Sequence, residues 1–203
     1  MTGRIGLFGG SFDPIHFGHL IAARSIAEQL QFESIVLIPA PRPPHKAHVV
    51  LANAADRLEL VRLAVEGDPL FSVSDIECQR TGPSYTLDTV NAFHAACPNA
   101  DLAWIVGADS LPELPSWYRI ADLVRRVRIV TAVRPGWSPP PRESLVAAVG
   151  DEPASRLIVD CIETPAVAIS ATDIRRRVKN GQSIRFLVPE AVRSYIDTRG
   201  LYR

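Results

Sequence analysis

Residues 9–19 are GGSFDPIHFGH, and they join a short apolar segment, residues 4–9, to a segment of helical periodicity, residues 19–30. The apolar segment predicts a buried strand and the periodic one an amphipathic helix. Gly9 and Gly10 allow a ligand to approach the backbone closely. The start of the following helix offers free N–H groups and the positive end of its dipole to a phosphate. The stretch therefore predicts a phosphate-binding turn.

Strand-like and helix-like segments alternate outward from this turn. Continuous apolar segments predict buried strands at residues 4–9, 34–39, 71–78, 101–106 and 128–133. Helical periodicity predicts helices at residues 19–30, 54–66 and 85–96, and residues 40–51 are a proline-rich loop. Apolar strands that alternate with helices predict a doubly wound, Rossmann-like α/β fold, in which helices cover both faces of a parallel sheet.

The last third of the chain has a different character. Residues 135–142 contain four prolines and predict a loop, and helices are expected at residues 170–180 and 189–198. Residues 171–203 carry eight Arg and Lys against three Asp and Glu, a local balance of +5. We expect a single domain, with a core at about residues 1–165 and a small C-terminal helical part at about residues 166–203.

Composition excludes several classes of protein. The chain has 203 residues, with 22 basic and 22 acidic side chains, and this balance argues against a general nucleic-acid binder. No apolar run approaches the ~20 residues of a membrane span, so no membrane partner is expected. Cys78, Cys97 and Cys161 match no zinc or redox motif. We expect a soluble cytoplasmic protein, whose oligomeric state the sequence does not indicate.

His16 and His19 are the first candidate functional side chains. They lie three residues apart, which places them on one side of a helical turn. Two imidazoles there can donate hydrogen bonds to phosphate oxygens and stabilise charge on a leaving pyrophosphate. The alternative is a metal site, because His45 and His48 repeat the spacing. Zinc sites need three or four well-placed ligands, and we expect no protein-bound metal.

These residues resemble a known family. The stretch GGSFDPIHFGH is similar to the HxGH signature of the nucleotidylyltransferase superfamily, in the form typical of bacterial nicotinate-mononucleotide adenylyltransferases. Further segments resemble that family's motifs in order along the chain: PPHK at 43–46, SYTLDT at 84–89, GAD at 107–109 with Trp117-Tyr118, RPG at 134–136 and ISATDIR at 169–175. Ala171 departs from the pattern, where the family often has a second serine, and this puts one hydroxyl contact in question.

The resemblance implies adenylyl transfer from ATP to nicotinate mononucleotide, giving nicotinate adenine dinucleotide (deamido-NAD) and pyrophosphate. Mg²⁺ is expected with ATP, held mainly by phosphates and water. The implied catalytic residues are His16, His19, Lys46 and Arg175. The implied ATP-binding residues are Gly9, Gly10, Ser11, Phe12, His19, Gly107, Asp109, Ser170, Thr172 and Arg175. The implied residues for the mononucleotide are Lys46, Thr86, Trp117, Tyr118 and Arg134.

Several of these residues have plainer interpretations. Ser170 precedes Asp173 by three residues, which predicts a capping box, so Ser170 could simply cap a helix. Lys46 could be a solvated surface lysine, Trp117 a packing residue and Arg134 a surface cap. Two other functions also remain open. One is a different acceptor within the superfamily, phosphopantetheine or nicotinamide mononucleotide, and the other is a non-catalytic nucleotide-binding module.

The expected acceptor pocket consists of hydrogen-bond donors. It combines the Thr86 hydroxyl, backbone N–H groups near Trp117 and Tyr118, and the indole face of Trp117. No Asp or Glu directly flanks Trp117-Tyr118, and Glu113 is expected on the far side of Pro115. Donors suit the acceptor-only oxygens of a carboxylate better than an amide NH₂, so the sequence predicts a preference for nicotinate over nicotinamide.

Overall fold

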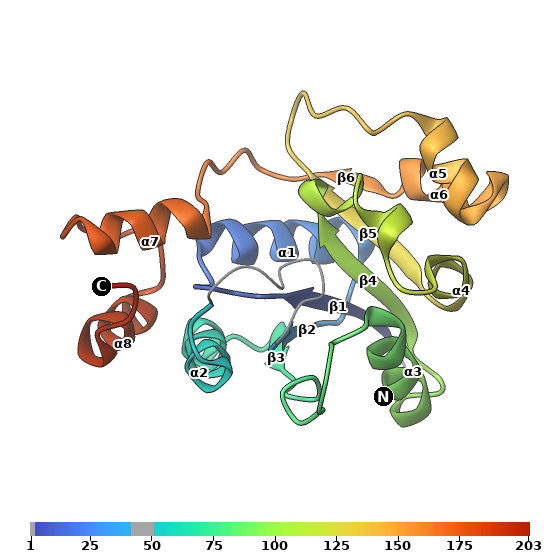
Figure 1. The fold of residues 1–203 in the computed structure, drawn as a ribbon. Coiled ribbons are helices and arrows are strands. Elements are labelled where there is room, and N and C mark those ends of the chain that lie inside the picture. Colours follow the sequence, from blue (N-terminus) through green and yellow to red (C-terminus); the bar gives the residue numbers. More distant parts are fainter. Residues whose placement is uncertain (1–2, 42–50) are drawn as a thin grey trace.

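The computed structural model describes residues 3–41 and 51–203, which form one sheet of six parallel strands flanked by helices (Figure 1). The strand order is β3-β2-β1-β4-β5-β6, so the direction of winding reverses between β1 and β4. The strands are β1 Arg4–Gly10, β2 Ser34–Pro39, β3 Phe71–Val73, β4 Asp101–Gly107, β5 Arg128–Val133 and β6 Cys161–Glu163. The predicted doubly wound parallel sheet is confirmed.

Helices cover both faces because alternate strand residues point to opposite sides. Leu7 and Trp104 belong to one core cluster with α3–α6, and Phe8 and Ile105 belong to the other with α1, α2, α7 and α8. The α-helices of the described residues are α1 Phe17–Leu30, α2 Ala54–Val65, α3 Thr86–Ala96, α4 Ile120–Arg126, α5 Arg142–Val149, α6 Asp151–Val159, α7 Ala171–Lys179 and α8 Glu190–Arg199. Two 3₁₀ turns, η2 Ala108–Ser110 and η3 Leu114–Ser116, follow β4.

Two parts of the fold differ from the sequence-based expectation. The strand predicted at residues 71–78 ends at Val73, and residues 76–79 form a turn. The backbone N–H of Ser74 donates to the carbonyl oxygen of Leu37 in β2, and this is the last backbone hydrogen bond between the two segments. The segments α4, α5, α6 and β6 were not predicted, since each is short and β6 has only three residues.

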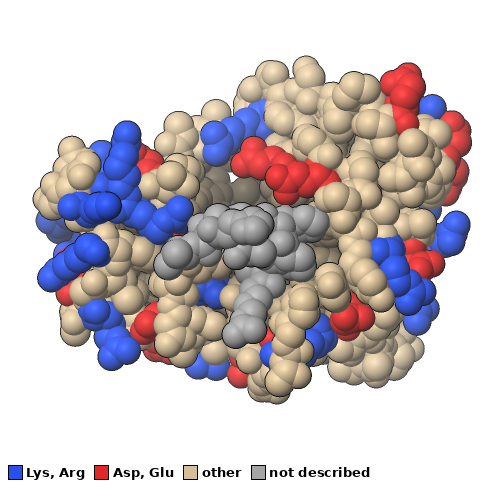
Figure 2. All heavy atoms as spheres, viewed as in Figure 1, with Lys and Arg blue, Asp and Glu red and all other residues tan. Residues whose placement is uncertain are grey.

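The C-terminal helices pack on the same core as α1 and α2. Val192 and Ile196 of α8 are fully buried in the cluster that contains Leu60 and Val61 of α2. The Tyr195 hydroxyl also donates to Asp56 of α2 at 2.9 Å. Figure 2 shows Lys and Arg side chains gathered over α7 and α8, at the left of the view. Nothing in residues 3–41 and 51–203 forms a helix long and apolar enough to cross a membrane.

Candidate active site

A pocket of about 160 Å³ opens where β1 and β4 diverge at their carboxyl ends. This is the switch point at which open α/β sheets bind ligands. The lining residues come from the ends of β1 and β4, from the start of α3 and from the segment around η3: Gly9, Gly10, Ser11, Ala40, Glu77, Ser84, Tyr85, Thr86, Trp104, Val106, Gly107, Ser110, Glu113, Trp117 and Tyr118. The pocket thus joins the phosphate-binding turn to the predicted acceptor residues.

Close packing requires the two glycines of the turn. A Cβ at Gly9 would lie 2.3 Å from Cζ2 of Trp104, and one at Gly10 would lie 3.1 Å from Cζ of Phe12. The Phe12 side chain is buried in the core, with its ring centroid 5.2 Å from that of His19. Because the Phe12 side chain is buried, any contact between Phe12 and a nucleotide would come from its backbone.

The two histidines form a stacked pair at the start of α1. Their ring centroids lie 3.8 Å apart, and the backbone N–H of His16 donates to Nδ1 of His19 at 3.3 Å. A nitrogen that accepts a hydrogen bond carries no proton, so in neutral His19 the proton is on Nε2. The backbone therefore fixes the tautomer of His19, with the ring proton on Nε2.

His16, whose ring stacks on that of His19, is a neutral residue. Burial and, to a smaller extent, the nearby positive charge of Arg134 lower its pKa from 6.5 to about 4. His16 is therefore uncharged at neutral pH. Gly18 lies between the two histidines because a Cβ there would come within 3.0 Å of the His16 ring. The spacing of the motif thus reflects the packing of this ring.

Arg175 reaches the phosphate-binding turn from α7. Its Nη1 donates to the carbonyl oxygen of Asp13 at 2.7 Å and lies 3.7 Å from the buried Asp13 carboxylate. Its Nη2 donates to the Thr172 hydroxyl at 3.3 Å. The Ser170 hydroxyl accepts from the backbone N–H of Asp173 at 3.2 Å, which confirms its predicted capping role. The fold therefore brings the ISATDIR segment against the first motif.

Three residues that hold this region were not identified from the sequence. Arg57 is buried and donates to four backbone carbonyl groups, at Ser11, Ala40, Pro41 and Ala52, over 2.6–3.0 Å. Asp13 accepts from the Tyr202 hydroxyl at 2.8 Å. Burial, together with the Asp13 charge, raises the pKa of Tyr202, so this hydroxyl remains protonated. Arg57, Asp13 and Tyr202 lie far apart in the chain, and no spacing could connect them.

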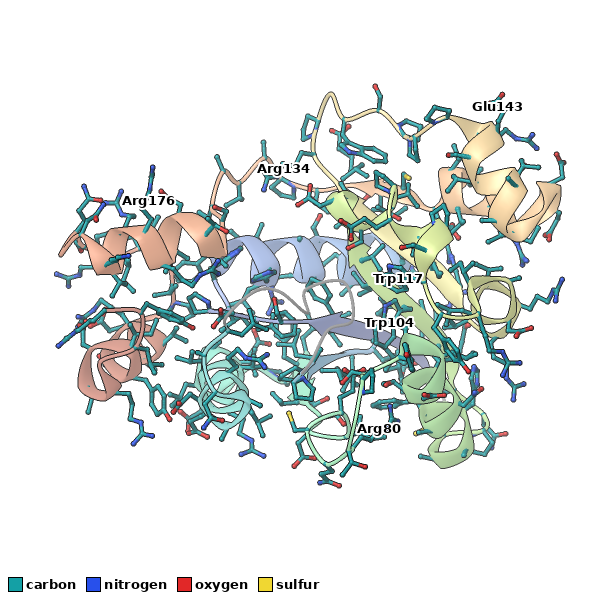
Figure 3. The ribbon with its side chains drawn as sticks, viewed as in Figure 1. Arg80, Trp104, Trp117, Arg134, Glu143 and Arg176 are labelled. Atoms are coloured by element: carbon teal, nitrogen blue, oxygen red, sulfur yellow. The ribbon has the colours of Figure 1, made fainter. Side chains whose placement is uncertain are left out.

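The acceptor half of the pocket lies at the N-terminus of α3. Thr86 is the first residue of that helix, and the ring of its N-cap, Tyr85, stacks on Tyr118 at a centroid distance of 4.3 Å. Trp117 packs against the core cluster that contains Trp104 (Figure 3). The start of α3 can supply N–H groups and a positive dipole end to an anion held beside these aromatic rings.

One expected donor of this pocket is engaged within the protein, and the expectation for Glu113 was wrong. The backbone N–H of Trp117 donates to the Leu114 carbonyl at 2.9 Å, so it is not a donor for a ligand. Glu113 lines the pocket instead of lying apart from it, and the buried Glu77 lines it as well. Glu77 was not identified from the sequence, and Glu113 was expected elsewhere, because only the turn after β3 and the fold of η3 bring these carboxylates to the aromatic pair.

The remaining predicted residues have mixed positions. Asp109 is exposed on η2, whereas its neighbours Gly107 and Ser110 line the pocket. Arg134 follows β5, is exposed and acts electrostatically on His16 (Figure 3). Lys46 lies outside the described residues, as do the histidines of the alternative metal site, His45 and His48. Within the described ranges, no three His, Cys, Asp or Glu side chains gather to hold a metal ion.

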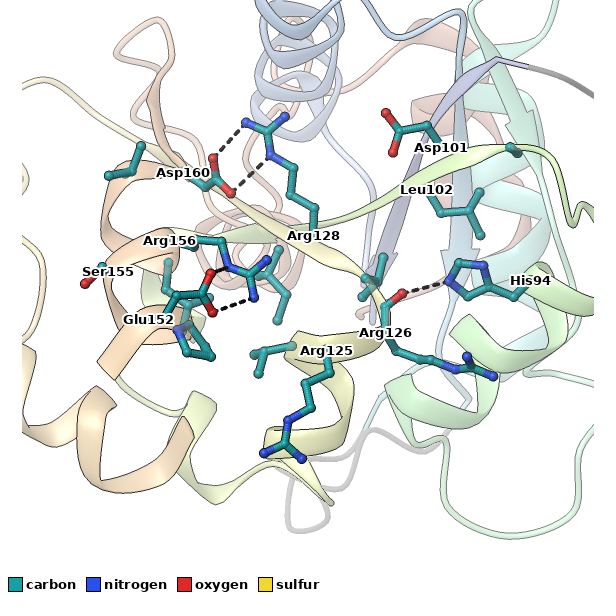
Figure 4. A pocket seen from close by; sticks show the side chains of 17 residues that line it. His94, Asp101, Leu102, Arg125, Arg126, Arg128, Glu152, Ser155, Arg156 and Asp160 are labelled. Carbon is teal, nitrogen blue, oxygen red and sulfur yellow. Dashed lines mark hydrogen bonds and ion pairs between the residues drawn. The ribbon is translucent and has the colours of Figure 1, made fainter. Parts of the chain in front are cut away.

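A larger cavity of about 610 Å³ lies at the opposite edge of the sheet, where β4 and β5 begin (Figure 4). Four of its charged side chains are paired with one another. Arg128 makes two hydrogen bonds to Asp160, at 3.1 and 2.7 Å, and Arg156 lies 2.9 Å from Glu152. Nucleotides bind at the carboxyl edge of such sheets. The candidate active site is therefore the smaller pocket.

Comparisons with known proteins agree with the fold. The family model described as "Cytidylyltransferase-like" matches residues 7–177. A Plasmodium falciparum nicotinic acid mononucleotide adenylyltransferase complexed with NaAD superposes with a TM-score of 0.77, at 16% identity, over 98% of this chain and 97% of that one. A structure described as a "Putative Nicotinate-nucleotide Adenylyltransferase" from Vibrio parahaemolyticus gives 0.71, at 19% identity, over 100% and 96%. The fold and the site define a nucleotidyltransferase of the cytidylyltransferase-like class.

Proteins that are similar in sequence identify the family within this class. A protein of Geobacillus kaustophilus named "Probable nicotinate-nucleotide adenylyltransferase" is 42% identical over 200 residues, which cover 98% of this chain and 86% of the relative. A protein of the same name from Desulfitobacterium hafniense (strain DSM 10664 / DCB-2) is 42% identical over 98% of this chain and 96% of its own length. The chain belongs to the nicotinate-nucleotide adenylyltransferase family.

Proposed function

We propose that this chain transfers the adenylyl group of ATP to nicotinate mononucleotide, giving nicotinate adenine dinucleotide and pyrophosphate in NAD biosynthesis. The observation that carries the proposal is the continuity of two half-sites. Gly9, Gly10 and Ser11 belong both to the turn that leads to the histidine pair and to the pocket of Thr86 and Trp117. Two substrates placed in these halves meet at the end of β1.

The ATP half of the proposed site consists of the turn and the start of α7. The mononucleotide phosphate attacks the α-phosphorus of ATP in line, and the bond to the pyrophosphate oxygen breaks. Charge then grows on the leaving pyrophosphate, where Nε2–H of His19 and the guanidinium of Arg175 stabilise it. His16 holds His19 in position, Ser170 and Thr172 order the start of α7, and Gly107 and Asp109 are assigned to the ATP nucleoside.

The acceptor half orients the mononucleotide. The pyridine ring lies beside the face of Trp117, and its carboxylate accepts hydrogen bonds from Thr86 and from the start of α3. Tyr118 completes this wall, and Arg134 and Lys46 are assigned to the acceptor phosphate. Mg²⁺ would enter with ATP and reduce the charge of the triphosphate. Catalysis by the chain itself rests on positioning and charge stabilisation, because no covalent nucleophile is needed.

The test is a product assay with three acceptors. The purified chain is incubated with ATP, Mg²⁺ and either nicotinate mononucleotide, nicotinamide mononucleotide or phosphopantetheine. Pyrophosphate release and the mass of the product are measured. We expect nicotinate adenine dinucleotide and an equal amount of pyrophosphate. Product from phosphopantetheine alone would show a different acceptor class. ATP binding without product from any acceptor would show a non-catalytic binding module.

A further inference from the structure

The acceptor pocket contains an acidic side chain whose presence there is unexpected. Glu77 is only 3% exposed, yet it lines the pocket together with Thr86 and Trp117. An uncompensated carboxylate at this place would repel the carboxylate of nicotinate and attract the amide NH₂ of nicotinamide. A site for nicotinate must therefore neutralise Glu77. Glu113, the other acidic residue of the pocket wall, is exposed, so water screens its charge.

A hydrogen-bonded chain links Glu77 to a positive charge. The hydroxyl of the fully buried Thr89 donates to Oε1 of Glu77 at 2.7 Å. Nη1 of Arg80 donates to the oxygen of the same hydroxyl at 2.7 Å, and Nη2 donates to the carbonyl of Asp88 at 3.2 Å. Thr89 and Asp88 belong to the first turn of α3, so the chain also ties Arg80 to the helix that begins at Thr86.

The electrostatics of Glu77 agree with this geometry. Burial raises the pKa of the Glu77 carboxyl, whereas the Thr89 hydroxyl, the neighbouring Ser84 hydroxyl and, to the smallest extent, the charge of Arg80 act in the opposite direction. Arg80 is half-buried, and the two residues occupy the same turn after β3. A guanidinium held in place near a buried carboxylate opposes its field at a neighbouring ligand.

We propose that Arg80 determines acceptor specificity by compensating, through the Thr89 hydroxyl, the charge of Glu77 in the pocket wall. The inference rests on the proposed function, since it assigns the pocket to the pyridine ring. Arg80 is a positioning and compensating residue, and it touches no reacting atom. Arg80 should change the preference for nicotinate over nicotinamide mononucleotide, and the binding of ATP should not depend on Arg80.

The experiment is a double-mutant cycle on the ratio of kcat/KM for nicotinate mononucleotide to kcat/KM for nicotinamide mononucleotide. Arg80→Met removes the compensating charge, so the ratio should fall at least ~10-fold. Glu77→Gln keeps an oxygen for Thr89 and leaves Arg80 uncompensated, so the ratio should rise at least ~3-fold. The double variant lacks both charges, and its ratio should return to within ~3-fold of the wild-type value.

Controls separate this electrostatic role from a structural one. Arg125→Met, on α4 at the opposite edge of the sheet, should leave the ratio unchanged, and the KM for ATP should be unchanged in every variant. A structural role for Arg80 would reduce both acceptors equally, without rescue by Glu77→Gln, and this result overturns the inference. If Arg80→Met does not fold, Glu77→Gln alone decides, because an unchanged ratio also overturns it. A wild-type chain inactive with both mononucleotides would instead refute the proposed function.

Discussion

His16 shows how burial fixes the chemistry of a single residue. Its pKa in the folded chain is about 4, below the ordinary value of 6.5 that the unfolded chain retains. The unfolded state therefore binds more protons between these two values. His16 contributes stability that is fully present above pH 6.5 and is lost as the pH falls toward 4. Acid should therefore destabilise the protein through this residue.

Urea unfolding at pH 7.5 and pH 5 measures this effect. The free energy of unfolding of the wild type should fall by roughly 2 kcal/mol more than that of His16→Gln, because only the wild type must charge a buried imidazole. The comparison removes the contribution of the other histidines, which both proteins share. An equal loss in the two proteins would show that His16 is not buried as a neutral ring.

His19 is expected to act on the transition state. Its Nε2–H is set by the bond from the His16 backbone to Nδ1, so His19→Ala removes one donor and leaves the backbone bonds of α1 intact. Removal of such a donor typically costs ~10²–10³ in kcat. The matched control is His94→Ala on α3, whose ring bonds to the Arg126 carbonyl at the opposite edge of the sheet. Turnover of His19→Ala within about threefold of the wild type would refute this role.

At the scale of single residues, sequence analysis found side chains in contiguous motifs, such as His16, His19 and Thr172. It missed Arg57 and Tyr202, which reach the site from α2 and from the end of the chain. It also placed Glu113 away from the pocket that this residue lines. These contacts depend on how distant segments pack, and no local pattern encodes them.

Among the elements, α7 makes the clearest functional prediction. Arg175 points from its first turns to Asp13, whereas Arg176 is exposed and pairs with Asp173 on the same helix. Arg175→Ala should raise the KM for ATP or lower kcat by about tenfold or more, because charge-assisted hydrogen bonds contribute ~1.5–3 kcal/mol. Steady-state kinetics with each substrate varied in turn measures this. Arg176→Ala is the control, and a change confined to the acceptor KM would refute the assignment.

The elements differ in how well the sequence predicted them. The bounds of β2 and β5 agree with the prediction, and β1, β4, α1 and α3 agree to within one or two residues, because each has a long apolar or periodic pattern. The segment Arg142–Glu163 was not predicted, although it contains α5, α6 and β6. These short elements pack on β5 and on one another, and short helices depend on such tertiary packing for their stability.

For the whole molecule, the strand order explains why one crevice serves two substrates. The reversal between β1 and β4 separates α1 from α3, and the N-termini of both helices lie beside the crevice. One N-terminus adjoins the histidine pair and the other adjoins the aromatic pocket. The alternation of apolar strands with helices predicted the parallel sheet covered on both faces, but not the strand order that creates this crevice. It could not predict the net charge of the acceptor pocket, which depends on the turn that buries Glu77.

Trp117 should stack on the pyridine ring of the acceptor without contacting the carboxylate or amide substituent. Trp117→Ala should therefore raise the KM for nicotinate and nicotinamide mononucleotides by similar factors, because stacking contributes on the order of 1 kcal/mol for either ring. The KM for ATP should stay nearly unchanged, since the indole packs on the Trp104 side of the crevice. Kinetics with both acceptors measures this, and a selective loss of one acceptor would contradict stacking as its role.

The choice between the two acceptors tests the central claim most directly. The start of α3 and the Thr86 hydroxyl present donors, and Arg80 lies beside the pocket carboxylate of Glu77. Such a site should satisfy a carboxylate and leave an amide NH₂ facing other donors. The measurement is kcat/KM for nicotinate and nicotinamide mononucleotides at saturating ATP and Mg²⁺. We predict a preference for nicotinate of at least ~10²-fold, since mismatched buried polar groups cost several kcal/mol. Equal values, or a preference for the amide, would contradict the account.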